Sequence, residues 1–176
     1  MIRKGDWQQT YTGKRFWPLD PRSREVDIID IAWSLSNQCR FLGHSSRFYS
    51  VAEHSVWVSH YCLQFPLEGL LHDAAEAYLA DVPRPLKPYL HGFREIEDNL
   101  LLVIFKKYDL KWPLPFEVER IDTALLRDEQ EQLMLLSSKQ RHQMTRPALG
   151  IKQRLGISSK QAFYDFIDRF KKLSGV

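Results

Sequence analysis

The sequence has 176 residues, the length of one domain, and is long enough to bury a hydrophobic core. Hydrophobic residues make up 44% and charged residues 27%, as in ordinary globular proteins, and no apolar run reaches the roughly 18 residues that a membrane span needs. The formal net charge of +3 comes from Lys and Arg spread along the whole chain, which does not favour a nucleic-acid polymer as a partner.

The cysteines and the first residues bear on where the protein works. Cys39 and Cys62 are too few and too far apart for a disulfide framework or a Cys-x-x-Cys metal site. The first residues lack the continuous apolar segment of a secretory signal. We therefore expect a cytoplasmic protein with no membrane partner.

Residues 1–25 are expected to form an irregular N-terminal arm, because glycines and prolines interrupt any regular pattern there. We expect residues 26–176 to form the domain on which this arm packs. The aromatic side chains of the arm could fold over the chain's own core or pack on a neighbouring subunit, and the sequence leaves both open. These side chains are Trp7, Tyr11, Phe16 and Trp17.

The rest of the chain has the apolar spacing of helices. Asp27 and Ser50 can cap the first two of them, and Glu53 follows Ser50 at the spacing of a capping box. Pro83 and Pro85 end the third helix. No segment alternates convincingly like a strand, so the predicted class is all-α, a single bundle of about six helices. The predicted helices cover residues 28–35, 50–63, 66–80, 93–108, 116–136 and 159–170.

A histidine and an aspartate, His72 and Asp73, stand in the middle of the apolar stretch from Gly69 to Ala77. Small alanines after them let other helices approach closely. Two adjacent polar side chains would be costly to bury there unless they were paired or bound to a metal. Imidazole nitrogen and carboxylate oxygen together suit a borderline divalent ion such as zinc, manganese, iron, cobalt or nickel.

Two further candidates lie on apolar helix faces. His54 could be a metal ligand or a core histidine whose ring bonds to a backbone carbonyl. Asp122 could be a ligand, or it could cap its helix or form an ion pair with Arg120 or Arg127. Asp128 competes with Asp122 for the role of ligand, but we interpret its helix face as solvated.

The order His, His-Asp, Asp on successive helices resembles the HD superfamily of metal-dependent phosphohydrolases. Residues 72–87, HDAAEAYLADVPRPLK, are similar almost residue for residue to a block of its bacterial 5′-deoxynucleotidase branch, and residues 50–55, SVAEHS, resemble the block that holds its first histidine. The resemblance covers about residues 28–136. It implies a homo-oligomer with one divalent transition metal ion (Zn, Co or Mn) per chain, held by His54, His72, Asp73 and Asp122.

The same resemblance implies roles for residues around the metal. Glu76, which a continuous helix would place on the face of His72, is the implied general acid or base. Asp81 would contact the sugar 3′-hydroxyl or assist proton transfer. Arg40 and Lys87 would contact phosphate, a task that suits a guanidinium fork. Phe41 takes the place of a Trp that helps to exclude ribose in the deoxynucleotidase branch.

The loop at residues 40–44, RFLGH, departs from that branch and is similar to small HD hydrolases of phages and bacteria, among them dATP triphosphohydrolases. Leu42, Gly43 and His44 would then lie near the base or the phosphates. The expected function is removal of phosphate from deoxynucleotides, in one version depletion of dATP from the pool of a bacterial or phage-infected cell. A triphosphate substrate would bring additional Mg²⁺.

Other functions stay open at this point. One is a 5′-deoxynucleoside monophosphatase of broad base specificity. A second is hydrolysis of cyclic nucleotides or alarmones, which is disfavoured because the histidines considered for a second metal are His44, His60 and His91, and His60 should point away. A third is a non-catalytic module that binds nucleotides or nucleic acid. Di-iron oxygenase chemistry would need further ligands, for which the sequence has no clear set.

Overall fold

The computed structural model describes residues 3–145 and 147–175 and is predominantly helical, which confirms the predicted all-α class. Among these residues the only sheet is a small antiparallel hairpin in which Gln8 faces Phe16. None of the described helices combines the length and the apolar character that a membrane crossing requires. The elements are β1 (Gln8–Gln9), β2 (Arg15–Phe16), α1 (Ile28–Asn37), α2 (Val51–Tyr61), α3 (Pro66–Leu71), α4 (Glu76–Leu79), α5 (Phe93–Lys107), α6 (Phe116–Leu133), α7 (Ser138–Gln143) and α8 (Ser159–Ser174).

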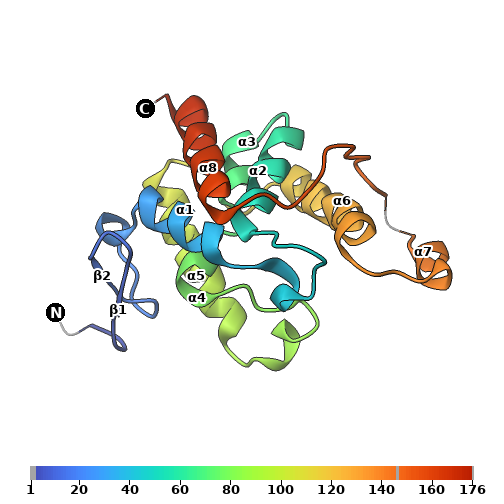
Figure 1. Ribbon diagram of the computed structural model, residues 1–176. Coiled ribbons are helices and arrows are strands. Elements are labelled where there is room, and N and C mark those ends of the chain that lie inside the picture. The colour runs from blue at the N-terminus through green and yellow to red at the C-terminus, as the bar shows by residue number, and fades with distance from the viewer. Residues whose placement is uncertain (1–2, 146, 176) are drawn as a thin grey trace.

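Helix α2 lies at the centre of the molecule and contacts α1, α3, α6 and α8 (Figure 1). Its start is capped as predicted, because the Ser50 hydroxyl accepts from the backbone N–H of Glu53 at 3.0 Å. The other half of the predicted capping box is absent. The Glu53 carboxylate instead accepts from the N–H groups of Gly156 and Ile157, at 2.8 and 3.0 Å, and so ties the segment before α8 to α2.

The predicted helix over residues 66–80 is wrong as a continuous element. It breaks into α3 and α4, and residues 72–75 form turns between them. In this segment the N–H of Ala74 bonds to Leu71 and that of Glu76 to Asp73, three residues back rather than four. Such tightening inside a helical stretch often marks a functional site.

Two other elements differ from the predicted ones. Helix α6 ends at Leu133 rather than near residue 136, and the short helix α7 that follows was not predicted. Helix α7 is capped at Ser137 and has no buried residue, so it carries no apolar spacing from which it could be recognised.

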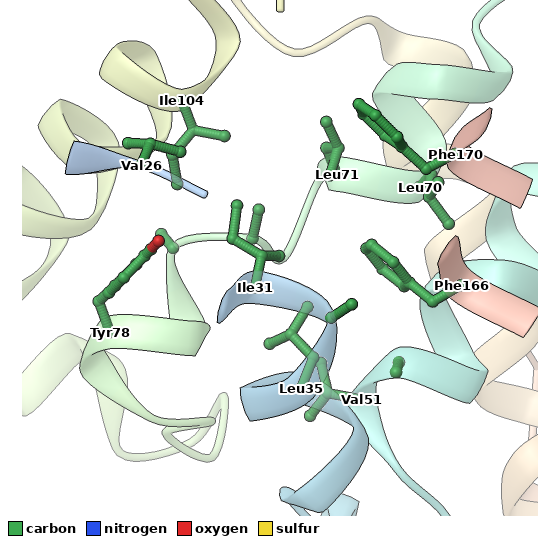
Figure 2. Packing of buried hydrophobic residues seen from close by; sticks show 14 of the residues in the cluster. Val26, Ile31, Leu35, Val51, Leu70, Leu71, Tyr78, Ile104, Phe166 and Phe170 are labelled. Atoms are coloured by element: carbon green, nitrogen blue, oxygen red, sulfur yellow. The ribbon is translucent and has the colours of Figure 1, made fainter. Parts of the chain in front are cut away.

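The main hydrophobic core fills the space between α1, α3 and α8, with side chains of α4 and α5 at its other end. Figure 2 shows Ile31 and Leu35 of α1 pointing into this core, with Phe166 and Phe170 of α8 nearby. A second cluster, which includes Tyr49 and Leu125, lies between α2 and α6. Burial of such side chains from water is the main favourable term in the stability of the bundle.

The N-terminal arm contains the β1–β2 hairpin, where the sequence predicted irregular structure, and it packs on its own chain. Phe16 is fully buried and its ring stacks on Tyr78 of α4, with centroids 3.8 Å apart. Tyr11 stacks on Trp33 of α1 at 4.1 Å but remains 57% exposed. The predicted arm begins at residue 1 and the predicted domain ends at residue 176, and both of these residues lie outside the described ones.

Alanine substitutions should show which aromatic residue of the arm anchors it to the rest of the chain. We expect Phe16→Ala to lower the free energy of unfolding by about 3–5 kcal/mol, as large-to-small changes in a core do. Tyr11→Ala, which removes a half-exposed stacking ring, should cost only about 0.5–1.5 kcal/mol. Urea denaturation monitored by circular dichroism measures both. Equal losses would contradict the assignment of Phe16 as the anchor of the arm.

Candidate metal centre

Four electron-rich side-chain atoms from three parts of the chain meet at one point. His54 comes from α2, His72 and Asp73 from the turn after α3, and Asp122 from α6. The Nε2 atoms of the two histidines are 3.3 Å apart. His54 Nε2 lies 3.3 Å from Asp122 Oδ1, and Asp73 Oδ2 lies 3.2 Å from His72 Nε2 and 3.6 Å from His54 Nε2. The structure thus brings together the four residues that the sequence analysis singled out as ligands.

The outer nitrogens of both rings have acceptors of their own. His54 Nδ1 lies 2.6 Å from a carboxylate oxygen of Glu129, and His72 Nδ1 lies 2.9 Å from the carbonyl oxygen of Gly69. A proton on each Nδ1 satisfies both contacts and leaves a lone pair on each Nε2. Two lone pairs that face each other at 3.3 Å repel, unless a proton or a cation lies between them.

The spacing of these atoms matches a metal site. Two ligands that each lie about 2.1 Å from one ion are about 3.0 Å apart at a right angle and about 3.4 Å apart at a tetrahedral angle. The donor atoms of His54, His72 and Asp122 all lie within 4.8 Å of one another, and these residues could hold a metal ion. Asp73 is not part of this group of three, but its Oδ2 lies 3.2 Å from His72 Nε2 and 3.6 Å from His54 Nε2.

The charges of the site respond to this crowding. Burial lowers the pKa of His54, and so does the nearby Arg40, but the carboxylates of Glu129 and Asp122 outweigh both and raise the pKa to about 9. Burial acts to raise the pKa of Asp73, but the neighbouring histidines hold it well below its usual range. The pKa of Asp122 is lowered in the same way, chiefly by His54. A positive charge at this point is therefore strongly stabilised.

Two of the four candidate ligands, Asp73 and Asp122, line a cleft of about 480 Å³. The two carboxylate ligands reach into the cleft, while both histidines are buried. Gly43 and His44, which were also expected near the base or the phosphates, are not among the residues that line this cleft. The other predicted catalytic and substrate-binding residues all line it. These residues are Arg40, Phe41, Leu42, Glu76, Asp81 and Lys87.

Glu76 lies in the cleft wall with only 4% of its surface exposed. One carboxylate oxygen is 3.4 Å from Lys87 Nζ, and the other, Oε2, is buried without a hydrogen-bond partner among the described residues. Burial, together with the charges of Asp73 and Asp81, raises the pKa of Glu76 well above its usual range. Burial also raises the pKa of Asp81. Lys87 is held by Glu97 at 2.8 Å.

Arg40 lies deeper than an ordinary substrate-binding arginine. Its side chain is only 12% exposed, and its guanidinium is 3.2 Å from Glu129 and 3.6 Å from Asp73. Its Nε is buried and has no hydrogen-bond partner in the part of the chain that the structure describes. The next two residues, Phe41 and Leu42, both adopt the left-handed conformation, with φ of 57° and 53°. Such backbone is strained in residues other than glycine and recurs at functional sites.

The sequence analysis missed three residues that support the site. Glu129 lies on α6 seven residues after Asp122, and an acid at that spacing on the same helix face is the signal that could have identified it. Gln38 bridges the two ends of α4, because its side chain donates to the Glu76 carbonyl and accepts from the Asp81 N–H, each at 3.0 Å. Arg84 pairs with Asp122 at 2.9 Å, in place of the expected alternatives Arg120 and Arg127.

The interpretation of Asp128 as a solvated residue was wrong. Asp128 is only 4% exposed, and its carboxylate accepts from the backbone N–H groups of Leu149, Gly150 and Ile151 at 2.6 to 2.8 Å. It therefore anchors the loop that contains residues 149–151. His60 lines a separate cleft with Trp57, so it does not join the metal group.

Comparison with known proteins identifies relatives but no activity. No family model matches the chain. The chain is 42% identical over 128 residues to the uncharacterized protein YfdR of Escherichia coli, a match that covers 72% of each of the two chains. It is 33% identical over 145 residues to an uncharacterized protein of Rhodobacter capsulatus, and this match covers 74% of each chain.

Loss of one nitrogen donor should abolish tight metal binding. Loss of a residue that only hydrogen-bonds to a metal ligand weakens metal binding by roughly 10–100-fold. We expect His72→Ala, which removes a ligand itself, to weaken the binding of Zn²⁺ or Co²⁺ by more than that. The matched control is His60→Ala, which removes a histidine of α2 from the separate cleft and should retain one ion per chain. Metal content by mass spectrometry and affinity by chelator competition measure both. Full metal content in His72→Ala would exclude this centre.

Proposed function

We propose that this chain, which belongs to the same protein family as E. coli YfdR, is a metal-dependent phosphohydrolase of the HD type that acts on deoxynucleotides. The observation that carries the proposal is the composition of one cleft. Two carboxylates of the donor cluster, a buried acid with a raised pKa and the cations Arg40 and Lys87 all line it. These are the groups that hydrolysis of a phosphate ester or anhydride requires.

The residues of the donor cluster would hold one divalent transition metal ion. Such an ion lowers the pKa of a bound water and withdraws charge from a phosphoryl oxygen. His54 and His72 supply neutral nitrogen donors, and Asp73 and Asp122 supply carboxylate oxygens that also face the cleft. An N/O donor set of this kind suits Zn²⁺, Co²⁺ or Mn²⁺.

The cations of the cleft would orient the phosphate. Arg40 and Lys87 are each fixed by carboxylates, so their positive ends keep a defined position without substrate. Arg84 also lines the cleft, and its side chain is 60% exposed, so a longer phosphate chain could reach it. Phe41 and Leu42 stand beside Arg40 in the lining, where they would pack against the sugar and base.

Glu76 would carry the proton of the reaction. Its pKa is raised well above the usual range by burial and by the charges of Asp73 and Asp81, which favours the protonated form of the carboxyl group. Among the residues that the structure describes, Oε2 has no competing hydrogen-bond partner. From this position the group can give a proton to the leaving oxygen or take one from the attacking water. Asp81, two residues beyond the end of α4, lines the same cleft and would bind the sugar hydroxyl.

A panel of nucleotides tests the proposal. We expect the purified protein with Co²⁺, Mn²⁺ or Zn²⁺ to release phosphate from deoxynucleotides, measured with mono-, di- and triphosphates of the four bases and of the matching ribonucleotides. Selective turnover of dATP, aided by Mg²⁺, identifies a dATP triphosphohydrolase. Release from several dNMPs identifies a 5′-deoxynucleotidase. Binding without turnover of any compound would instead identify a non-catalytic nucleotide-binding module.

Substitution of the buried acid should separate chemistry from metal binding. We expect Glu76→Gln to lower kcat by about 10²–10⁴-fold, because the amide cannot transfer the proton, while one ion per chain remains bound. The matched control is Glu97→Gln, which removes the other carboxylate that contacts Lys87 and should act mainly on KM. Steady-state kinetics and metal analysis of both variants measure this. Unchanged kcat in Glu76→Gln would remove Glu76 from the reaction.

A further inference from the structure

We propose that Glu129 is a positioning residue of the metal centre, which holds the His54 ring so that Nε2 faces the ion. The inference rests on the metal ion of the proposed function. It goes beyond that function because it gives a role to a residue that does not itself reach the donor cluster.

The contacts of Glu129 support this role. The side chain is fully buried on α6, and its Oε1 accepts from His54 Nδ1 at 2.6 Å and from the Tyr49 hydroxyl at 2.9 Å. Its Oε2 accepts from Arg40 at 3.2 Å. Three donors therefore fix the carboxylate, and the short contact to Nδ1 fixes both the tautomer and the rotation of the ring. A ligand histidine whose other nitrogen bonds to a carboxylate is also a stronger base at the metal.

The position of Glu129 on the helix adds a second argument. Asp122 lies on α6 seven residues earlier, which is two turns and therefore the same face. One helix thus supplies a donor directly through Asp122 and orients another donor, His54 of α2, through Glu129. The contact between α2 and α6 brings the two helices together at this place.

A purely structural role for Glu129 would consist of neutralising the buried Arg40 and filling the core. Such a role predicts lower stability of the metal-free protein and an unchanged intrinsic affinity for metal. Asp128 provides the matched control, because it is the neighbouring residue on α6, is 4% exposed, and among the described residues its carboxylate bonds to backbone N–H groups of a loop.

The experiment compares Glu129→Gln with Asp128→Asn in the full chain. We expect Glu129→Gln to weaken Co²⁺ and Zn²⁺ binding by about 10–100-fold in chelator competition, and to change the visible absorption spectrum of the Co²⁺ protein. Asp128→Asn should lower the melting temperature of the metal-free protein and leave both the metal affinity and the spectrum unchanged.

Glu129→Asp is the second variant, for the case that Glu129→Gln does not fold. It keeps the negative charge beside Arg40 but withdraws the carboxylate from His54 Nδ1 by one methylene, so we expect it to weaken metal binding as well. Wild-type affinity in a folded Glu129 variant overturns the inference, and so does an equal loss in Asp128→Asn. A wild-type protein that binds no metal would count against the proposed function instead.

Discussion

The structure depends on the electrostatic cost of placing two imidazole lone pairs and two carboxylates around one point in the interior. Isolated lone pairs and anions repel one another strongly where water is excluded, so the cluster is stable only with positive charge at its centre. The bundle provides this geometry through its central helix. Helix α2 carries His54 and contacts α3 and α6, which lead to the other donors. Even in the metal-free state a proton on His54 takes part of the role of a cation.

Much of the fold could be predicted because apolar spacing, caps and prolines act locally. The starts of α1 and α2 follow from Asp27 and Ser50, and the proline-rich turn ends α4. The break between α3 and α4 could not be predicted, because HDAAEAYLA consists largely of good helix formers. Residues distant in sequence hold this segment. For example, the side chain of Gln38 forms hydrogen bonds at both ends of α4. Intrinsic propensity gives no information on contacts of this kind.

The site was predictable to a similar extent. Polar residues in apolar stretches, together with the resemblance of residues 72–87, led to the four candidate ligands and to the residues that line the cleft. Neighbouring acids on α6 were harder to distinguish. Asp128 and Glu129 are both buried, but one bonds to a loop more than twenty residues away and the other to Tyr49 and Arg40. Partners so distant in sequence leave no local pattern, so the two roles became visible only in three dimensions.

The left-handed conformation of Phe41 and Leu42 has a consequence for laboratory evolution. Each of these residues stores backbone strain of about 1–3 kcal/mol at the rim of the cleft. Glycine or asparagine would relieve that strain, so a screen for thermostability alone would favour them at these positions. Variants enriched by such a screen would lose the side chains that shape the mouth of the cleft. At these two positions, selection for thermostability alone would therefore act against the present shape of the cleft.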